Sequence, residues 1–370
     1  MKRKVIIFPY TAEYAPLIRN RRLLVNHEIV ACISPVGYGL QGKDASYAYG
    51  GESTGIIITD KGISELDFDD LLVCDSSSDF ETFVLPQIKV AAERGKNVII
   101  LYDVDKECQK EVESVCAENN VKCEIITNRI MDTSKLVKHD HEIIQISVPV
   151  VFVASVIENT NKFDVQLGLR DFLLKEGYKV SQIGTKEYCE IFGFHAIPKF
   201  MFENQLSESE KIVSFNRVCK SIELQEKPDI FIIGIPGATM VFNEVITNRF
   251  GITAFEIANA VHPDTAIICV PYEGYDAGFL KMIQTSSKYK LSMPADCFNI
   301  ANKHFDAARS KAEKKLSFIT TGVDLVDKRI ADLKRDSEIP IYNSLNTASA
   351  LEMYSYIVNK LSESDFGTIC

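Results

Sequence analysis

The chain lacks the sequence patterns that would assign a membrane span, a secretion signal or a familiar metal-dependent or kinase active site. No apolar run reaches the roughly 18 residues that a spanning helix needs, and the apolar stretch before Pro9 is too short for a signal-peptide core. An H-E-x-x-H helix and the protein-kinase motifs are also missing. We therefore expect a cytoplasmic protein, and the sequence leaves its catalytic residues unknown.

Metal-binding patterns are equally scarce. The ten cysteines are scattered without a CxxC pair, and we expect them to be reduced thiols. His139 and His141 flank Asp140 and would share one face of an extended segment, as metal ligands do. Because no third or fourth ligand follows at short spacing, we predict a solvated linker there and no metal site.

The chain also lacks a basic excess. It carries 41 Lys and Arg against 51 Asp and Glu, which gives a net charge of -10 and a pI near 5.3. A protein that binds nucleic acid or an anionic membrane normally shows surplus positive charge. We expect neither of them as a partner.

What the chain does contain is an alternation of apolar, strand-length runs with helical patterns. At 370 residues it is long enough for two domains, and strands without a polar face indicate parallel sheets covered by helices on both sides. We predict two doubly wound, mainly parallel α/β domains. The first is a Rossmann-like domain over 1–130 and the second a P-loop-NTPase-like domain over 148–370. A connection over 131–147 joins them. The expected strands of the first domain are 4–10, 28–34, 55–59, 71–76, 97–104 and 122–127.

The second block opens with the unbroken apolar run 148–155, which predicts a central strand because a strand with no polar face must be covered on both sides. Its other expected elements are helix 161–176, strand 179–184, a helix around 207–226, strands 229–238, 266–272 and 315–321, helix 323–335, strand 339–343 and helix 346–361.

The strand, loop and helix over 148–169 occupy the place of a phosphate-binding loop but lack its glycines. Placing Lys162 on the lysine of G-x-x-x-x-G-K-[ST] puts Val156 and Asn161 on the two glycines. Phe163 then stands on the hydroxyl that would hold magnesium, and phenylalanine has no oxygen to offer a metal. The loop is therefore degenerate.

The carboxylate that would hold magnesium is missing too. Asp229 stands at the start of its apolar run, whereas a Walker B aspartate ends one, and no carboxylate follows Ile233 until Glu244. We expect no nucleotide hydrolysis. The cofactor is unknown, and binding of a nucleotide or another phosphate ligand stays open.

Lys162 at a helix N-terminus is the first candidate for binding a ligand. The end of a helix presents N–H groups and positive potential to an anion, and the loop neighbours Asn159, Thr160 and Asn161 would line the same site. Glu158 would repel a phosphate. An ordinary solvated lysine on an amphipathic helix would leave the same pattern.

Two further loops follow strand ends, where open parallel sheets form their ligand crevice. The first strand ends in PYTAEYAP and lacks the dinucleotide-binding pattern G-x-G-x-x-G. The glycine-rich loop PVGYGLQGKDA (35–45) instead follows the second strand. The other lies in IGIPGATMVFNE (233–244). The candidate ligand-binding residues on these loops are Lys43, Asp44, Gly237 and Asn243. We predict that both loops form one cleft with 156–162, although plain turns would also contain glycine.

Cys189 and His195 could form a thiolate and its base. They lie in KEYCEIFGFHAIPKFMF (186–202), which is rich in aromatic side chains. That composition favours a buried or partner-facing segment instead.

Phrases spread over nearly the whole chain resemble a known family. They are KVIIFPYTAEYAPLIRNRRLL, SPVGYGLQGKDA, ENTNKFDVQLGLRDFL, YKVSQIGTKEYCEIFG and IIGIPGATM. They resemble clostridial peptide maturation system proteins, found in clusters for ribosomally made peptide natural products beside short precursor peptides and radical S-adenosylmethionine maturases. The resemblance implies a pathway, such as bacteriocin biosynthesis, rather than a reaction. More distantly, the chain resembles two-domain Rossmann and P-loop NTPase-like proteins whose loop keeps its glycines.

Three functions follow from these expectations. The first is an accessory protein that binds a precursor peptide or a maturase without hydrolysing nucleotide. The second is an enzyme that uses ATP or another phosphate ligand through a non-standard loop, with Lys162 as the phosphate contact, to modify the peptide or a small metabolite. The third is a sensor that recognises a small anion.

Overall fold

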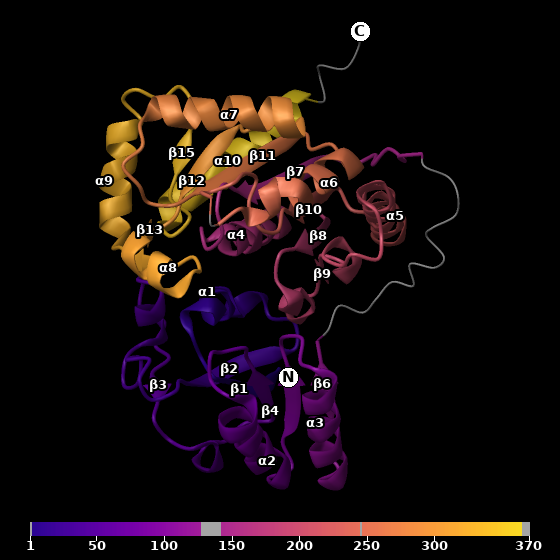
Figure 1. Cartoon of the computed structure of the whole chain (residues 1–370), viewed down its shortest axis with the longest axis vertical. Helices are drawn as coiled ribbons and strands as arrows, with labels where there is room; N and C mark the ends of the chain where they lie inside the picture. Colours follow the sequence, from indigo (N-terminus) through magenta and orange to yellow (C-terminus); the bar gives the residue numbers. More distant parts are fainter. Residues whose placement is uncertain (1, 127–141, 245, 365–370) are drawn as a thin grey trace. The chain divides into compact units, whose positions relative to one another are not determined.

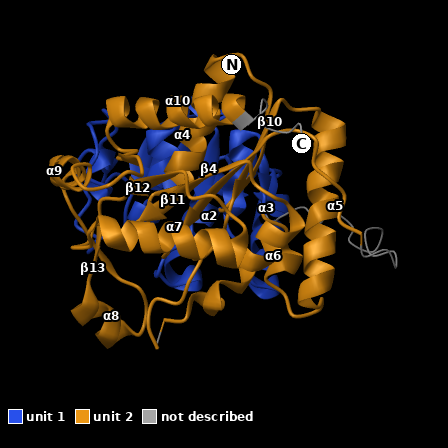
Figure 2. Ribbon diagram, turned by 90° about the horizontal axis from the view of Figure 1, so that it is seen from above, with its two compact units in different colours: residues 1–129, 186–196 blue, residues 130–185, 197–370 orange. Residues whose placement is uncertain are grey.

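The computed structural model of the chain describes residues 2–126, 142–244 and 246–364 (Figure 1). The chain divides into two compact units, coloured separately in Figure 2. Unit 1 comprises Met1–Arg129 and Lys186–Ala196, and unit 2 comprises Ile130–Thr185 and Ile197–Cys370. The predicted domain 148–370 contains the segment 186–196, which the structure groups with unit 1.

Unit 1 is built on a six-stranded parallel sheet in the order β3-β2-β1-β4-β5-β6. Its strands are β1 (Arg3–Phe8), β2 (His27–Ile33), β3 (Ile58–Thr59), β4 (Asp70–Val73), β5 (Asn97–Ile100) and β6 (Cys123–Ile125). The order reverses between β1 and β4, which is the switch point of a Rossmann-like sheet. The expected Rossmann-like architecture is confirmed.

The helices of unit 1 are α1 (Ala15–Arg19), α2 (Leu85–Glu93) and α3 (Lys106–Glu118). Alternate strand residues such as Ile6 and Phe8 pack with α2 and α3 in one apolar core. Helix α3 begins after Asp105, whose carboxylate accepts the N–H groups of Glu107 and Cys108 at 2.9 Å each. This side-chain cap explains why the helix starts there.

Unit 2 contains a second parallel sheet, whose strands within the unit run in the order β15-β12-β11-β7-β10-β8. They are β7 (Val150–Ser155), β8 (Val180–Gly184), β10 (Ile230–Gly234), β11 (Thr265–Val270), β12 (Cys297–Ile300) and β15 (Ile341–Tyr342). All six residues of β7 are buried, and β7 pairs with β10 and β11. The prediction of a central strand over 148–155 is confirmed.

Helices cover both faces of the second sheet. The described α-helices of unit 2 are α4 (Lys162–Lys175), α5 (Glu208–Glu226), α6 (Ile252–Ala260), α7 (Ala277–Leu291), α8 (Ala307–Glu313), α9 (Val323–Leu333) and α10 (Thr347–Ser364). Val151 and Val153 of β7 belong to a core with α4 and α10, whereas Phe152 and Ala154 belong to a core with α5, α6, α7 and α9. Figure 2 shows α4 and α10 on one side of β11 and β12, with α7 on the other. The apolar run of β7 is thus divided between two cores.

Several parts of unit 2 were absent from the sequence expectation: strand β12, helices α6, α7 and α8, and the short strand over 303–305. The predicted strand 315–321 exists as β14 (Phe318–Thr320), but it pairs antiparallel with β13 (Lys303–Phe305) in a separate two-stranded sheet. The two-residue strand β9 (His195–Ala196) lies at the end of the 186–196 segment. Among the described residues no helix is both long and apolar enough to cross a membrane.

Candidate functional site

The carboxyl ends of β7, β10, β11 and β12 lie at one edge of the unit 2 sheet. Strands β8 and β10 follow β7 in the chain but lie on one side of it, and β11 and β12 lie on the other. Ligand crevices of open parallel sheets form at such a reversal of strand order. We call the residues that meet here the β7 rim, namely Ser155, Asn161, Lys162, Gly237 and Asn302.

Lys162 begins helix α4 and is buried, with 8% of its surface exposed. Its ammonium group donates to the carbonyl oxygens of Ile235 at 2.5 Å and Gly237 at 2.8 Å. The alternative of a solvated lysine is therefore wrong. In this conformation the side chain joins α4 to the loop after β10.

The loop before α4 obtains its tight course from asparagine instead of glycine. Asn159 has a φ of 59° and Asn161 a φ of 58°, in the left-handed region that asparagine tolerates better than most residues. Val156, which aligns with the first motif glycine, is buried, and its N–H donates to the Cys269 carbonyl at 3.2 Å. Asn161, at the second motif glycine, therefore has the left-handed backbone conformation that glycine would allow. Val156, at the first, is not among the residues with a positive φ.

The other loop residues are held by neighbours within unit 2. The hydroxyl of Thr160 donates to the Ile157 carbonyl at 3.3 Å, and the Asn161 amide donates to the Asn302 side-chain oxygen at 3.3 Å. Asn161 is the N-cap of α4 but makes no side-chain cap hydrogen bond.

The charges around the start of α4 do not favour a polyphosphate. Asp164 lies in the first turn and is 8% exposed, so a carboxylate already complements the helix N-terminus. Burial raises the pKa of the Cys269 thiol to about 12, while Lys162 lowers that pKa and Asp164 raises it. Both charges therefore act at the end of β11. Glu158 is exposed in the loop.

Asp229 lies away from this edge of the sheet. Asp229 lies just before β10, where its carboxylate accepts the Lys179 N–H at 2.7 Å. That position is the amino end of the strand, opposite the rim. Phe163 is buried at 4% exposure and offers no oxygen to a metal.

The loop after β10 has two roles. Gly237 has a φ of 66°, and its carbonyl accepts from Lys162 and from the Ser155 hydroxyl at 3.2 Å. Asn243, in contrast, forms a turn in which its side-chain oxygen accepts the Ile246 N–H at 2.7 Å. Gly237 thus belongs to the β7 rim, while Asn243 has a structural contact.

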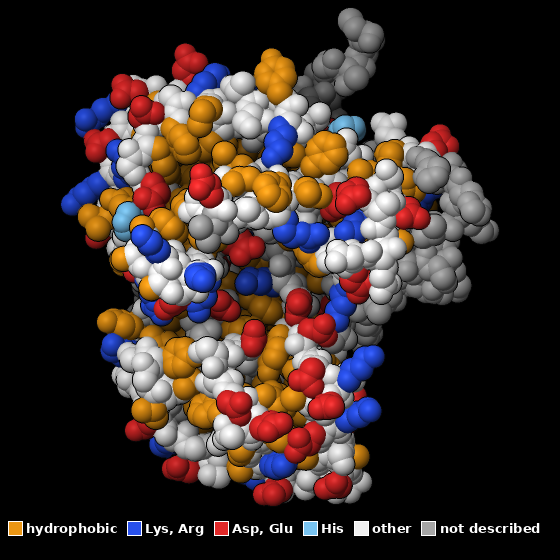
Figure 3. Space-filling model, viewed as in Figure 1, with side chains coloured by type: hydrophobic (Ala, Val, Ile, Leu, Met, Phe, Trp, Pro, Cys, Tyr) orange, Lys and Arg blue, Asp and Glu red, His pale blue; other side chains and the backbone are white. Residues whose placement is uncertain are grey.

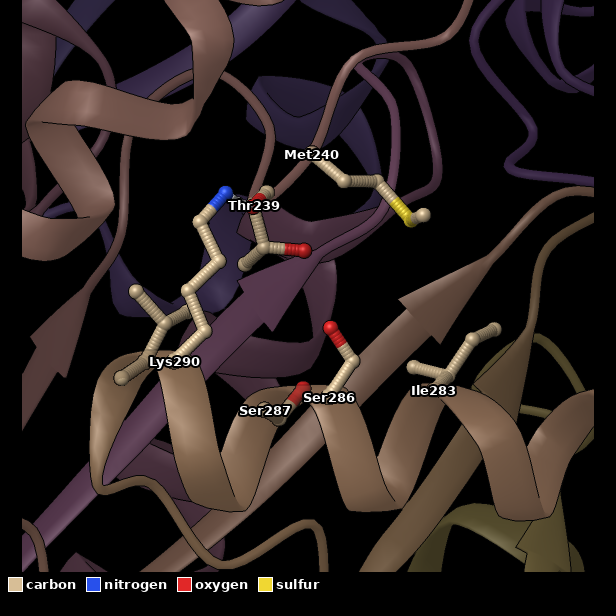
Figure 4. Close-up of a pocket in the computed structure, with 7 residues that line it drawn as sticks. Thr239, Met240, Ile283, Ser286, Ser287 and Lys290 are labelled. Atoms are coloured by element: carbon tan, nitrogen blue, oxygen red, sulfur yellow. Dashed lines mark hydrogen bonds between the residues drawn. The ribbon is translucent and has the colours of Figure 1, made fainter.

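The same loop borders a small pocket against α7 (Figure 4). Its lining residues are Thr239, Met240, Ile283, Ser286, Ser287, Lys290 and Leu291. The space inside it is about 10 Å³, which is room for roughly one water molecule and far below the volume of small-molecule sites. The sequence expectation missed this pocket because it missed α7.

Lys43 and Asp44 belong to unit 1, and the other candidate residues belong to unit 2. Asp44 accepts hydrogen bonds from the N–H groups of Ser46, Thr54 and Gly55. Partial burial raises its pKa, but the hydrogen bonds from Thr54 and Ser46 outweigh this and hold the pKa well below its usual range. Asp44 thus organises its own loop. Lys43 lies over the Tyr47 ring at 3.7 Å.

Two motif matches in unit 1 escaped the sequence expectation. GYGLQGKD (37–44) satisfies both G-x-G-x-x-G and the first seven positions of the Walker pattern, with Asp44 in place of the hydroxyl. A short 3-10 turn, Ala45–Ala48, follows it instead of a helix. The N–H groups of Gly42 and Ala45 donate to Ile58 and Ile56. These N–H groups support the loop and do not face a phosphate.

The second match is GESTG (51–55), which fits the G-x-S-x-G pattern of a nucleophile elbow. An elbow requires a strand directly before the serine and a helix directly after it, and neither is present here. The Ser53 hydroxyl donates to the Asp44 carboxylate at 2.9 Å. Ser53 therefore supports the same loop and is not placed as a nucleophile.

The remaining candidates are Cys189 and the histidines beside Asp140. Cys189 is buried together with Tyr188, Ile191 and Phe192. This agrees with the expectation of a buried aromatic segment. His139, Asp140 and His141 lie outside the described residues. Over the residues that the structure does describe, no group of three or more His, Cys, Asp or Glu side chains could hold a metal ion.

Comparison with known proteins identifies the fold. No protein-family model matches the chain, and no curated protein matches it by sequence. A DUF1611 family protein from Anabaena variabilis is similar in structure, with a TM-score of 0.60 and 10% identity over 98% of this chain and 100% of that one. An amine dehydrogenase from Mycobacterium smegmatis matches over 39% of the chain with a TM-score of only 0.29. The first likeness shows that the two-unit architecture occurs in another protein.

Proposed function

We propose that the chain is an accessory protein in the maturation of a ribosomally synthesised peptide, and that it binds the precursor peptide or the maturase without hydrolysing nucleotide. The resemblance of its phrases to peptide maturation system proteins supports the pathway. The β7 rim supports the absence of hydrolysis.

The observation that carries the proposal is the position of Lys162. A phosphate that drew its ammonium away from the carbonyls of Ile235 and Gly237 would remove the Lys162 donor from the buried Ile235 carbonyl. Each buried carbonyl left without a donor costs about 1–3 kcal/mol. The phosphate would also approach the carboxylate of Asp164, and magnesium would find no oxygen at Phe163. The strand, loop and helix that would surround a nucleotide therefore stabilise the fold here.

The experiment measures turnover and binding on the purified chain. With ATP or GTP and magnesium we expect no release of phosphate above background and no shift in the melting temperature, since a ligand that does not bind cannot stabilise the folded state. Calorimetric titration with a precursor peptide or a maturase from a neighbouring gene should show binding. Phosphate release that disappears in Lys162→Met would overturn the proposal.

The enzyme alternative has one observation in its favour. Asn159 and Asn161 give the loop before α4 a left-handed backbone, and alternating backbone conformations of this kind can form an anion-binding concavity. Saturable binding of ATP or inorganic phosphate, weakened in Asn161→Pro with the fold intact, would favour this alternative.

A further inference from the structure

Exposed apolar side chains gather on helices α6 and α7 and on the loops around them in unit 2. We call this set the α6–α7 surface. It consists of Val241, Phe250, Ile252, Phe255, Met282 and Tyr289. Tyr289 is 80% exposed and Phe250 is 58% exposed. In Figure 3 hydrophobic side chains collect where Figure 1 places α6 and the adjoining stretch of α7, with both basic and acidic side chains beside them.

Helix spacing and one lysine bring these residues together. Met282, Ser286 and Tyr289 are four and three residues apart, so they lie along one side of α7. Lys290 donates to the backbone carbonyls of Thr239 and Phe250, each at 3.2 Å. It therefore ties the loop after β10 and the turn before α6 to α7. The pocket of Figure 4 lies where they meet, with Thr239 and Met240 opposite Ser286 and Lys290.

The turn before α6 has an unusual backbone that presents Phe250 to solvent. Asn248, Arg249 and Phe250 have φ angles of 50°, 50° and 57°, and Gly251 follows at 72°. A bulky residue with positive φ is a conformational outlier. Such outliers persist where the surrounding structure holds them, often at binding sites.

Helix α7 is basic although the whole chain is acidic. Around α6, in contrast, the acidic Glu208 lies near the buried Glu256, and the exposed Asp264 follows the end of the helix. Helix α7 carries Lys281, Lys288 and Lys290, and its only carboxylate is the N-cap Asp276. Arg249 adds a positive charge in the turn, and Glu256 of α6 is buried. The exposed acidic residue of the preceding loop is Glu244. The lysines of α7 and Arg249 beside exposed apolar side chains, on a chain of net charge -10, favour an acidic partner over a basic one.

We propose that the α6–α7 surface docks an acidic segment of a peptide that carries spaced apolar side chains. Apolar side chains of the segment would cover Phe255 and Tyr289, while its carboxylates would face Lys281, Lys288 and Arg249. This inference rests on the proposed peptide-binding function, and it places the peptide on a surface made by α6 and α7 instead of on the β7 rim.

The test is fluorescence anisotropy of the full chain with a labelled synthetic peptide of about 16 residues, in which Leu and Phe recur every three or four positions and Glu fills the others. A second peptide has Lys in place of Glu. We expect the acidic peptide to bind at least about tenfold more tightly than the basic one, with affinity falling as salt rises from about 50 to about 300 mM. Tyr289→Ala and Lys288→Glu should each weaken binding about fivefold or more.

Matched controls lie elsewhere in unit 2. Leu351→Ser changes an exposed apolar residue of α10, and Lys311→Glu reverses an exposed lysine of α8. Both should leave affinity unchanged, and circular dichroism should show all variants folded. Binding that is equal in Tyr289→Ala, or equal for the two peptides, or absent from the wild type would overturn the docking surface. Loss of a wild-type dimer in Tyr289→Ala would also overturn it, in favour of self-association.

The same variants separate this inference from the proposed function. If a precursor peptide from a neighbouring gene binds the wild type and Tyr289→Ala with the same affinity, the docking surface is wrong and peptide binding stands. If the synthetic acidic peptide binds at this surface but neither precursor nor maturase does, the surface stands and the proposed pathway is wrong.

Discussion

Lys162 illustrates how burial changes the role of a residue that sequence alone marks for ligand binding. A lysine at a helix N-terminus after a strand and a loop predicts an anion contact. In the structure its ammonium satisfies two backbone carbonyls, so its removal acts on the fold. Replacing an exposed lysine by alanine usually changes stability by about 0.5 kcal/mol or less, but Lys162 is only 8% exposed.

We predict that Lys162→Ala lowers the free energy of unfolding by about 1–3 kcal/mol, because it removes the Lys162 donor from the buried Ile235 carbonyl and leaves the Gly237 carbonyl with the Ser155 hydroxyl alone. Urea unfolding followed by circular dichroism measures this. Lys175→Ala on the same helix, whose side chain is 60% exposed, should change stability by less than about 0.5 kcal/mol. Equal midpoints for the two variants would contradict the structural role.

Asp44 gives a pH-dependent prediction at the same scale. Its pKa in the folded protein lies well below the unfolded value of about 3.9. The carboxylate therefore stabilises the folded state above that value, and this contribution is lost as the pH falls toward the folded pKa. Between pH 7 and about pH 3.5 the urea midpoint should fall less in Asp44→Asn than in the wild type. Asp60→Asn, an exposed aspartate of the same unit, serves as the control, and an identical pH response of both variants would count against Asp44.

Secondary-structure elements with unbroken apolar runs were the easiest to predict. Strand β7 has no polar face, and helix α4 follows it at the expected place. Strand β12 (CFNI) and helix α7 (AGFLKMIQTSSKYKL) were missed. The first has a buried asparagine in its apolar run, and the second has an exposed face of mixed polarity. Their positions follow from packing on β11, which a local pattern does not contain.

Helices α4 and α10 pack closely enough that one glycine decides their separation. A Cβ placed on Gly168 of α4 would lie 2.1 Å from the hydroxyl oxygen and 2.8 Å from the Cζ atom of Tyr354 on α10. Tyr354 is 4% exposed and belongs to the core between the helices and the sheet. The ring therefore has little room to move.

We predict that Gly168→Ala lowers the free energy of unfolding by about 1–3 kcal/mol through overpacking, although alanine has the higher helix propensity. Tyr354→Phe in the same chain should recover part of this loss, since it removes the nearer of the two atoms. A double-mutant cycle measured by urea unfolding gives the coupling. Additive effects of the two substitutions would show that the helices separate freely.

At the scale of the whole molecule, the segment 186–196 departs from the simple division of the chain into consecutive domains. The Val25 N–H donates to the Ile191 carbonyl at 3.2 Å, and the rings of Tyr14 and Tyr188 lie 5.3 Å apart. Unit 1 therefore includes residues that the chain supplies only after it has begun unit 2.

We predict that residues 1–126 alone are less stable than the same fragment joined by a flexible Gly/Ser linker to 186–196. Tyr188, Ile191 and Phe192 are buried, and each contributes at most about 1.5–3 kcal/mol on burial. The linked fragment should gain at least about 2 kcal/mol in urea unfolding. A linked fragment in which Tyr188 and Phe192 are replaced by serine is the matched control. The same midpoint for all three would show that the segment adds nothing to unit 1.

The sequence by itself determined the two parallel α/β sheets and the degenerate state of the loop before α4. Apolar periodicity and motif positions are local properties, readable without coordinates. The tertiary structure alone decided that Lys162 is buried, that Asp44 organises its own loop and that 186–196 joins unit 1. Each depends on groups distant in the chain, such as the Ile235 carbonyl 73 positions from Lys162. Burial and hydrogen-bond partners arise only when such distant segments pack, and no local pattern encodes them.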